Sequence, residues 1–291
     1  MSLLHSLAVR ALPVSLDAQD CGYTDSRTIL TFGMQRSGQH LVIGWICRNL
    51  GDCIHFNHCR YVRSGLTYRL TPLTGRRAVY EQGEIRDDSG AQGRALFRSS
   101  VQDLRTRNLL YSMEDMRPNV ALLNKMLGGR PATIVLILRD PFNWLASSLA
   151  HGISTESELR GKIATYRSHL SYATGEKTAD GYSLVAVDYG RFVTDAEYRY
   201  KLAGNLGLGV SDSAEASLSR IPNFGGGSSF SKTQFDESHQ SSVFTRWEKF
   251  VGDPFYRSIL NDRELTDSAD AFFGELPFRR EVDAAMDQAG H

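Results

Sequence analysis

The stretch TILTFGMQRSGQH, residues 28–40, decides the fold of this chain. Its first five residues are apolar or β-branched, and such a short continuous run is typical of a buried parallel strand. A turn beginning at Gly33 follows, and the apolar residues of segment 41–50 then recur with helical spacing. Strand, turn and helix in this order predict the first unit of an α/β fold.

The chain contains a second unit of the same kind. TIVLILRDP, residues 133–141, is another apolar run that ends in a turn, and residues 142–150 again show helical spacing. Further strands are predicted at 108–112 and 183–189, and further helical segments at 154–178, 196–206 and 243–260. The pattern predicts an α/β fold, a three-layer α/β/α arrangement around a central parallel sheet, as in P-loop nucleotide-binding proteins.

Length and composition exclude several classes of protein. The chain has 291 residues, of which 41% are hydrophobic, so it can bury a sizeable core as one domain spanning residues 1–291. Lys and Arg number 33, as do Asp and Glu, and this balance argues against a nucleic-acid partner. No apolar run approaches the ~20 residues that a membrane span needs, and no signal peptide is recognisable, so a cytoplasmic protein is expected.

Few residues suggest a disulfide framework or a metal site. The four cysteines are expected to be free thiols in such a compartment. Cys53, His55, His58 and Cys59 are metal-capable residue types, but their spacing matches no zinc motif, and we expect no metal.

Two segments are predicted to be irregular. Residues 55–107 are expected to form an insertion or lid, and their part from Arg60 to Arg107 holds ten Arg, no Lys and five acidic residues. Residues 223–242 are polar and glycine-rich, and they are expected to form a loop over a ligand. The local excess of arginine suits an anionic partner.

The turn after the first strand has the spacing of a phosphate-binding loop. Gly33 and Gly38 fit the pattern G-x-x-x-x-G, in which backbone N–H groups and the following helix N-terminus face phosphate oxygens. A nucleoside triphosphatase would continue with Lys and Ser or Thr, which hold the terminal phosphates and Mg²⁺. This chain has Gln39 and His40 instead. The sequence therefore favours a phosphate-containing ligand used without a metal.

Arg36-Ser37-Gly38 resembles the 5′-phosphosulfate loop of sulfotransferases that use 3′-phosphoadenosine 5′-phosphosulfate (PAPS), usually [KR]-S-G-T-T. The resemblance implies that Arg36 neutralises charge on the leaving phosphate. It also implies that Ser37, Gly38, Gln39 and His40 hold the 5′-phosphate. The last two replace the usual Thr-Thr pair, and both can donate hydrogen bonds.

The end of the second apolar strand carries the other phosphate motif. Arg139 and Ser147 are eight positions apart, and the carboxyl ends of parallel strands are where such sheets bind ligands. Asp140-Pro141 suits a helix start, with a capping Asp and Pro in the first turn. The pair resembles the sulfotransferase motif in which an Arg and a Ser grip the 3′-phosphate of the donor.

The C-terminal third offers a looser match. Sulfotransferases carry a loop and a helix start with a basic residue and Trp, which together close over the adenosine 3′-phosphate. Segment 244–247, FTRW, is similar to that helix start. The resemblance assigns backbone and hydroxyl contacts with the donor to Gly226, Gly227, Ser228 and Ser229.

The resemblance also implies a general base that takes the proton of an acceptor hydroxyl. In the family this base is a His or a Glu near the end of a strand that precedes the 3′-phosphate strand. Glu114 is the first choice here, followed by Asp115, His58 and His40. The acceptor is a hydroxyl compound of unspecified kind, such as a carbohydrate, small molecule or lipid, and the arginine excess suits an anionic one.

Two other functions remain open at this level. One is a P-loop kinase for a small molecule, although the residues after Gly38 lack the expected Lys and Ser/Thr. The other is a sulfotransferase-like module that binds a nucleotide without catalysis. The oligomeric state is not indicated by the sequence.

Overall fold

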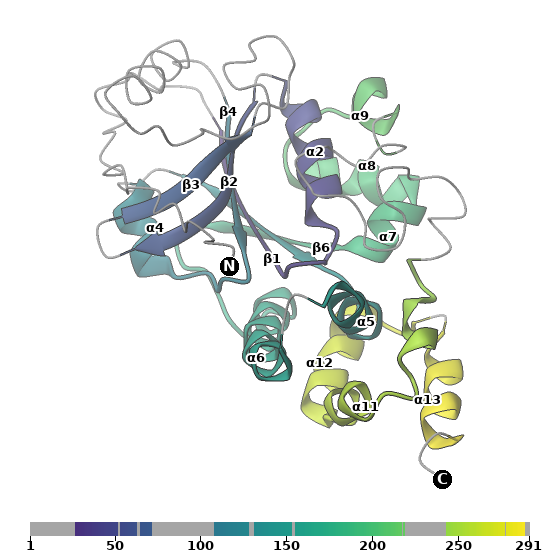
Figure 1. The fold of residues 1–291 in the computed structure, drawn as a ribbon. Helices are drawn as coiled ribbons and strands as arrows, with labels where there is room; N and C mark the ends of the chain where they lie inside the picture. Colours follow the sequence, from purple (N-terminus) through teal and green to yellow (C-terminus); the bar gives the residue numbers. More distant parts are fainter. Residues whose placement is uncertain are drawn as a thin grey trace, which may run out of the picture.

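A six-stranded sheet forms the centre of the protein (Figure 1). The computed structural model describes residues 27–51, 53–62, 65–71, 108–127, 131–152, 155–216, 218, 243–276 and 278–288. The strands lie in the order β3-β2-β4-β1-β5-β6. They span Thr28–Gly33 (β1), Cys53–Val62 (β2), Gly65–Thr71 (β3), Asn108–Glu114 (β4), Thr133–Leu138 (β5) and Ser183–Asp188 (β6).

Five of these strands are parallel, and β3 pairs with β2 in the antiparallel direction at one edge. The strand runs predicted at 28–32, 108–112, 133–138 and 183–189 are confirmed, except that Tyr189 begins a helix instead of ending the last strand. The residues of β1, β4 and β5 are largely buried because helices cover both faces of the sheet there, whereas those of the edge strand β6 are mostly half-buried.

Helices lie between successive parallel strands along much of the chain and form their crossover connections. They span Gln39–Leu50 (α2), Val120–Leu127 (α4), Pro141–His151 (α5), Glu156–Ala173 (α6), Tyr189–Thr194 (α7), Ala196–Asn205 (α8), Asp212–Ala216 (α9), Pro254–Leu260 (α11), Arg263–Phe273 (α12) and Arg279–Gln288 (α13), with a 3-10 helix η3 at Arg246–Lys249. Within the described residues, none of these helices is long and apolar enough to cross a membrane.

The two faces of the sheet have separate apolar cores. Side chains of α2, α7, α8 and α9 pack on the face that presents Val135 and Val187. Side chains of α4 pack on the opposite face, which presents Leu136. A third core joins α5 and α6 to the C-terminal helices α11, α12 and α13, which lie together at the foot of Figure 1. The result is the α/β/α layering predicted from the sequence.

Residues 53–71, most of which were predicted to begin an insertion, instead extend the central sheet as β2 and β3. Residues 72–107, which complete that predicted insertion, lie outside the described residues, as does the predicted donor-covering loop 223–242. The helical pattern at 243–260 is divided in the structure into η3 and α11, because Asp253 caps a new helix that starts at Pro254.

Cys47 of α2 and Cys53 of β2 are buried thiols whose sulfur atoms lie 2.7 Å apart. Burial raises the pKa of the Cys47 thiol. Both belong to the apolar core beneath α2 and are packed there as small hydrophobic residues.

Replacing a buried leucine of the sheet should destabilise the fold far more than replacing an exposed one. We expect Leu136→Ala, in β5 and fully buried, to lower the free energy of unfolding by about 2–5 kcal/mol. The matched control Leu122→Ala lies on α4 with its side chain 37% exposed, and it should change stability by less than about 0.5 kcal/mol. Urea denaturation followed by circular dichroism measures both values, and equal losses would contradict the assigned burial.

Candidate functional site

Four parallel strands end side by side and bring the predicted site residues together. Gly33 at the end of β1 is in register with Glu114 of β4 and with Ile137 of β5. Arg139 follows β5, and Tyr189 follows β6 directly. This edge of the sheet is where open α/β sheets bind their ligands.

The turn after β1 adopts a conformation that side chains seldom permit. Arg36 has a φ of 72° and Gly38 a φ of 82°, both left-handed. The Ser37 backbone N–H donates to the Met34 carbonyl oxygen at 3.0 Å, which closes the turn. The Ser37 hydroxyl is buried and has no hydrogen-bond partner among the described residues. Buried hydroxyls are normally bonded, so this one is suited to a ligand oxygen.

Gly38 is required by a close contact as well as by its backbone conformation. A Cβ at this position would lie 2.2 Å from Cε2 of Tyr189, inside the aromatic ring. The Tyr189 ring therefore packs directly against the turn that starts α2. The same ring faces the guanidinium of Arg139, whose central carbon lies 5.6 Å from the ring centroid.

Arg139 is buried and largely without acceptors. It is 2% exposed, and its Nη2 donates to the Val243 carbonyl oxygen at 2.5 Å. Its Nε is buried without a partner, and no other acceptor bonds the guanidinium within the described residues. A guanidinium has five N–H donors, so most of the hydrogen-bonding capacity of Arg139 remains available to a ligand.

A chain of hydrogen bonds links Ser147 to Asp140, the residue that follows Arg139. Arg246, at the start of η3, donates from Nη1 to the Ser147 hydroxyl at 2.8 Å. Its backbone N–H donates to Asn143 Oδ1 at 2.9 Å. Asn143 is in turn held by Asp140, which caps α5 as the sequence predicted. Hydrogen bonds thus join Asp140, Asn143, Ser147 and Arg246 in one polar cluster beside Arg139.

Three guanidiniums therefore lie within electrostatic reach of one another. Burial lowers the pKa of Arg36 and of Arg139. Burial, together with the positive charges of Arg139 and Arg36, lowers the pKa of Arg246 to about 9. Asp140 opposes the shift at Arg139 and Arg246, and Glu114 opposes it at Arg36. An anion bound among the arginines would offset this unfavourable crowding of like charge.

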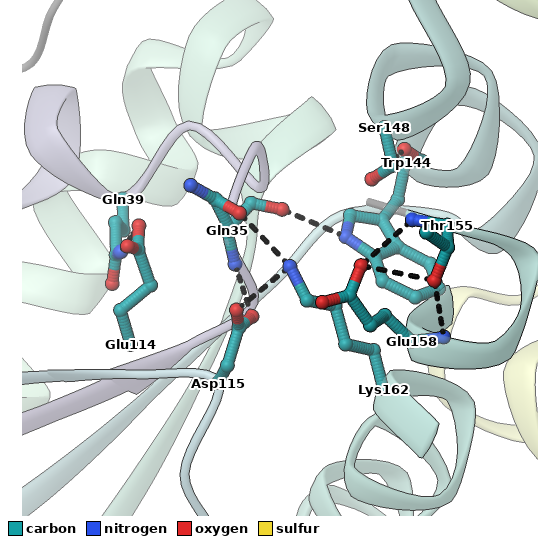
Figure 2. Close-up of polar contacts among 9 residues, drawn as sticks. All are labelled: Gln35, Gln39, Glu114, Asp115, Trp144, Ser148, Thr155, Glu158 and Lys162. Carbon is teal, nitrogen blue, oxygen red and sulfur yellow. Dashed lines mark hydrogen bonds and ion pairs between the residues drawn. The ribbon is translucent and has the colours of Figure 1, made fainter. Parts of the chain in front are cut away.

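Asp115 holds the turn between β1 and α2 through its side chain (Figure 2). Its Oδ1 accepts from the Gln35 backbone N–H at 2.7 Å, and its Oδ2 pairs with Lys162 Nζ at 3.0 Å. Lys162 also donates to Gln35 Oε1 at 2.9 Å, and Trp144 Nε1 donates to the Gln35 carbonyl oxygen at 2.9 Å. These bonds fix the turn between β1 and α2.

Glu114, the neighbouring carboxylate, lies among the site residues. It is 6% exposed, and its Oε1 accepts from Gln39 Nε2 at 2.6 Å. His40 follows in the first turn of α2 and is partly buried. His58 lies within β2, with its side chain outside the description, and Gly226, Gly227, Ser228 and Ser229 fall outside the described residues.

Several residues of the site carried little signal in the sequence. In the sequence, Arg246 stands out only as part of a segment similar to a family helix start, and it lies about a hundred positions from Ser147. Tyr189 and Lys162 had no assigned role. Tyr189 ends a predicted strand, which places it at the ligand-binding edge of the sheet, and this position was its available signal. Nothing in the spacing indicated Lys162.

Comparisons with known proteins give a distant structural likeness. No protein-family model matches the chain, and a search of curated proteins found no relative. Among solved structures, the chain is similar to the sulfotransferase domain from the Synechococcus PCC 7002 olefin synthase. The TM-score is 0.43 at 12% sequence identity, and the match covers 87% of this chain and 97% of that one.

Gly38→Ala should disrupt the loop through its contact with Tyr189. We expect it to cost about 2 kcal/mol more stability than Gly152→Ala. Gly152 has a similar φ of 64°, but a Cβ there would meet no atom within 4 Å, so the control carries the backbone strain without the clash. Urea denaturation measures the difference in the free energy of unfolding. Equal losses in the two variants would show that the Tyr189 ring can move aside without cost.

Stability should depend on the ionisation of Asp188, which caps α7. Burial and, to a lesser extent, the neighbouring Asp140 raise the pKa of Asp188 to about 6. The folded state thus holds a proton that the unfolded state releases near pH 4, so stability is lost as pH rises through about 6.

Asp188→Asn keeps a capping side chain but cannot ionise. We expect wild type to lose on the order of 2 kcal/mol relative to this variant between pH 4 and 7. Urea denaturation at several pH values tests this, and parallel stability profiles would contradict it.

Proposed function

We propose that the protein is a sulfotransferase that moves a sulfuryl group from PAPS to an acceptor hydroxyl. The observation that carries the proposal is the buried guanidinium of Arg139, which donates only one hydrogen bond within the described residues. Together with Arg246 and Ser147, it offers a site for one phosphate group. The loop of residues 33–38 offers a second, adjoining site.

Two phosphate sites at one sheet edge suit a donor with separate 3′- and 5′-phosphates. The unbonded Ser37 hydroxyl and the N-terminus of α2 would hold the 5′-phosphate. Arg139 and Arg246 would hold the 3′-phosphate, whose charge offsets their mutual repulsion. A triphosphate used by a kinase would instead require the Lys and Ser/Thr that this loop lacks.

The residues present can perform the transfer without a metal. The donor supplies the sulfuryl group: the bond from sulfur to the bridging phosphate oxygen breaks as a bond to the acceptor oxygen forms. Glu114 takes the proton of the acceptor hydroxyl. Arg36 balances the charge on the departing phosphate, and burial strengthens that interaction. The acceptor is a hydroxyl compound whose class the described residues do not define.

A thermal-shift titration with adenosine 3′,5′-bisphosphate tests the donor site. A ligand that binds only the folded state raises stability by mass action, and we expect the midpoint to rise by about 5 °C at a hundredfold excess over Kd. ADP and Mg·ATP should give smaller shifts, because neither has a 3′-phosphate. The Arg139→Ala and Arg246→Ala variants should lose most of the bisphosphate shift.

Arg167→Ala is the matched control, since Arg167 pairs with Asp262 and Glu264 on the outside of α6. It should keep the full bisphosphate shift. A shift with Mg·ATP alone would favour the kinase, and no shift with any nucleotide would reject the donor site. Bisphosphate binding without release of bisphosphate from PAPS, across a panel of sugars, phenols and lipids, would favour a non-catalytic module.

A further inference from the structure

Gln39 directs its side chain toward Glu114 at the end of β4 (Figure 2). It is the first residue of α2, and its side chain is 3% exposed. The contact with Glu114, at 2.6 Å, joins residues 75 positions apart. A single side chain thus bonds the start of the phosphate-loop helix to the carboxylate assigned as base.

The charge of Glu114 determines which end of the amide faces it. An amide oxygen placed against a carboxylate would be repelled, so the NH₂ group occupies that position and donates. The amide oxygen at the other end is buried without a partner within the described residues. It lies 3.1 Å from the position that a Cβ of Gly33 would take, as does the Ser37 hydroxyl. The missing side chain of Gly33 provides the space in which this amide is confined.

The hydrogen bond acts on a buried charge. A carboxylate removed from water must be satisfied by donors, and a bond to its ionised form favours that form. Arg36 lies within electrostatic reach of the same carboxylate. An ionised, oriented carboxylate is what a general base requires.

We propose that Gln39 is a positioning residue for Glu114, holding the base ionised and in place relative to the donor loop. This inference rests on the proposed function. The sulfotransferase motif has a Thr at this position, and the resemblance alone would make Gln39 a ligand of the 5′-phosphate. The geometry points instead to a role in turnover, with little contribution to the affinity of the protein for PAPS.

Gln39→Met tests the role, because Met has a similar length and volume but no N–H donor. The readouts are bisphosphate affinity by thermal shift and turnover by release of bisphosphate from PAPS with the acceptor found in the panel. We expect kcat to fall by up to about a hundredfold, as misplaced catalytic groups do, while bisphosphate affinity changes little. The acid limb of the pH–rate profile should move to higher pH, because the ionised carboxylate has lost a donor.

Two further variants make the result specific. In a Glu114→Gln background, Gln39→Met should cause no additional loss of turnover, since both changes remove one interaction. Gln288→Met, an exposed position at the end of α13, is the matched control and should behave as wild type.

Three results would overturn the inference. If bisphosphate affinity falls in parallel with turnover and the pH–rate profile is unchanged, Gln39 instead binds the 5′-phosphate of PAPS. If the two losses add in the double variant, the two residues act independently. If the wild type is active and Gln39→Met has the same activity, the positioning role is rejected. If the wild type binds the bisphosphate but turns over no acceptor, the proposed transferase function itself is rejected.

Discussion

The confinement of three arginines at one edge of the sheet is the constraint on which the site depends. Guanidiniums that share a buried region repel one another and lose hydration, as the lowered pKa of Arg246 shows. The fold tolerates this because Asp140 serves two purposes. It caps α5 through Asn143, and its charge opposes the shifts at Arg139 and Arg246. The compensation is partial, so a bound anion would stabilise the folded protein.

One aromatic ring at this edge lies between the two proposed phosphate sites. The Tyr189 ring contacts Gly38 of the loop on one side and faces the Arg139 guanidinium on the other. Tyr189 begins α7 directly after β6, so its position is set by the sheet. We infer that the distance between the sites is a property of the fold.

The apolar strands could be predicted from the sequence because burial on both faces leaves a continuous apolar run. β2 could not, since polar and apolar residues mix along CIHFNHCRYV, and three of its polar side chains are His or Asn. Its buried His55 and Asn57 each form a hydrogen bond with Ser112 of β4, a partner 55 or more positions away. Only tertiary structure supplies such partners, so local patterning indicated an insertion instead.

The site residues, like the strands, could be predicted where a local pattern of the sequence marks them. Arg139 and Ser147 lie in one strand–helix unit, so their spacing carried information. Arg246 reaches them from another part of the chain, and no local spacing reports such an approach. The sequence marks the segment that holds it by resemblance, but the contact with Ser147 follows from the three-dimensional structure alone.

Glu114 and Asp115 show what a sequence leaves undetermined about neighbouring carboxylates. Glu114 is the last residue of β4, where strand alternation directs it to the face covered by α2. Asp115 has a φ of 57°, which turns the chain and takes its side chain to Gln35 and Lys162. One carboxylate therefore holds the loop in its shape, while the other is held by Gln39 from that loop's own helix. Because both bonds end on the same strand terminus, the conformation of the loop and the orientation of the proposed base are set together.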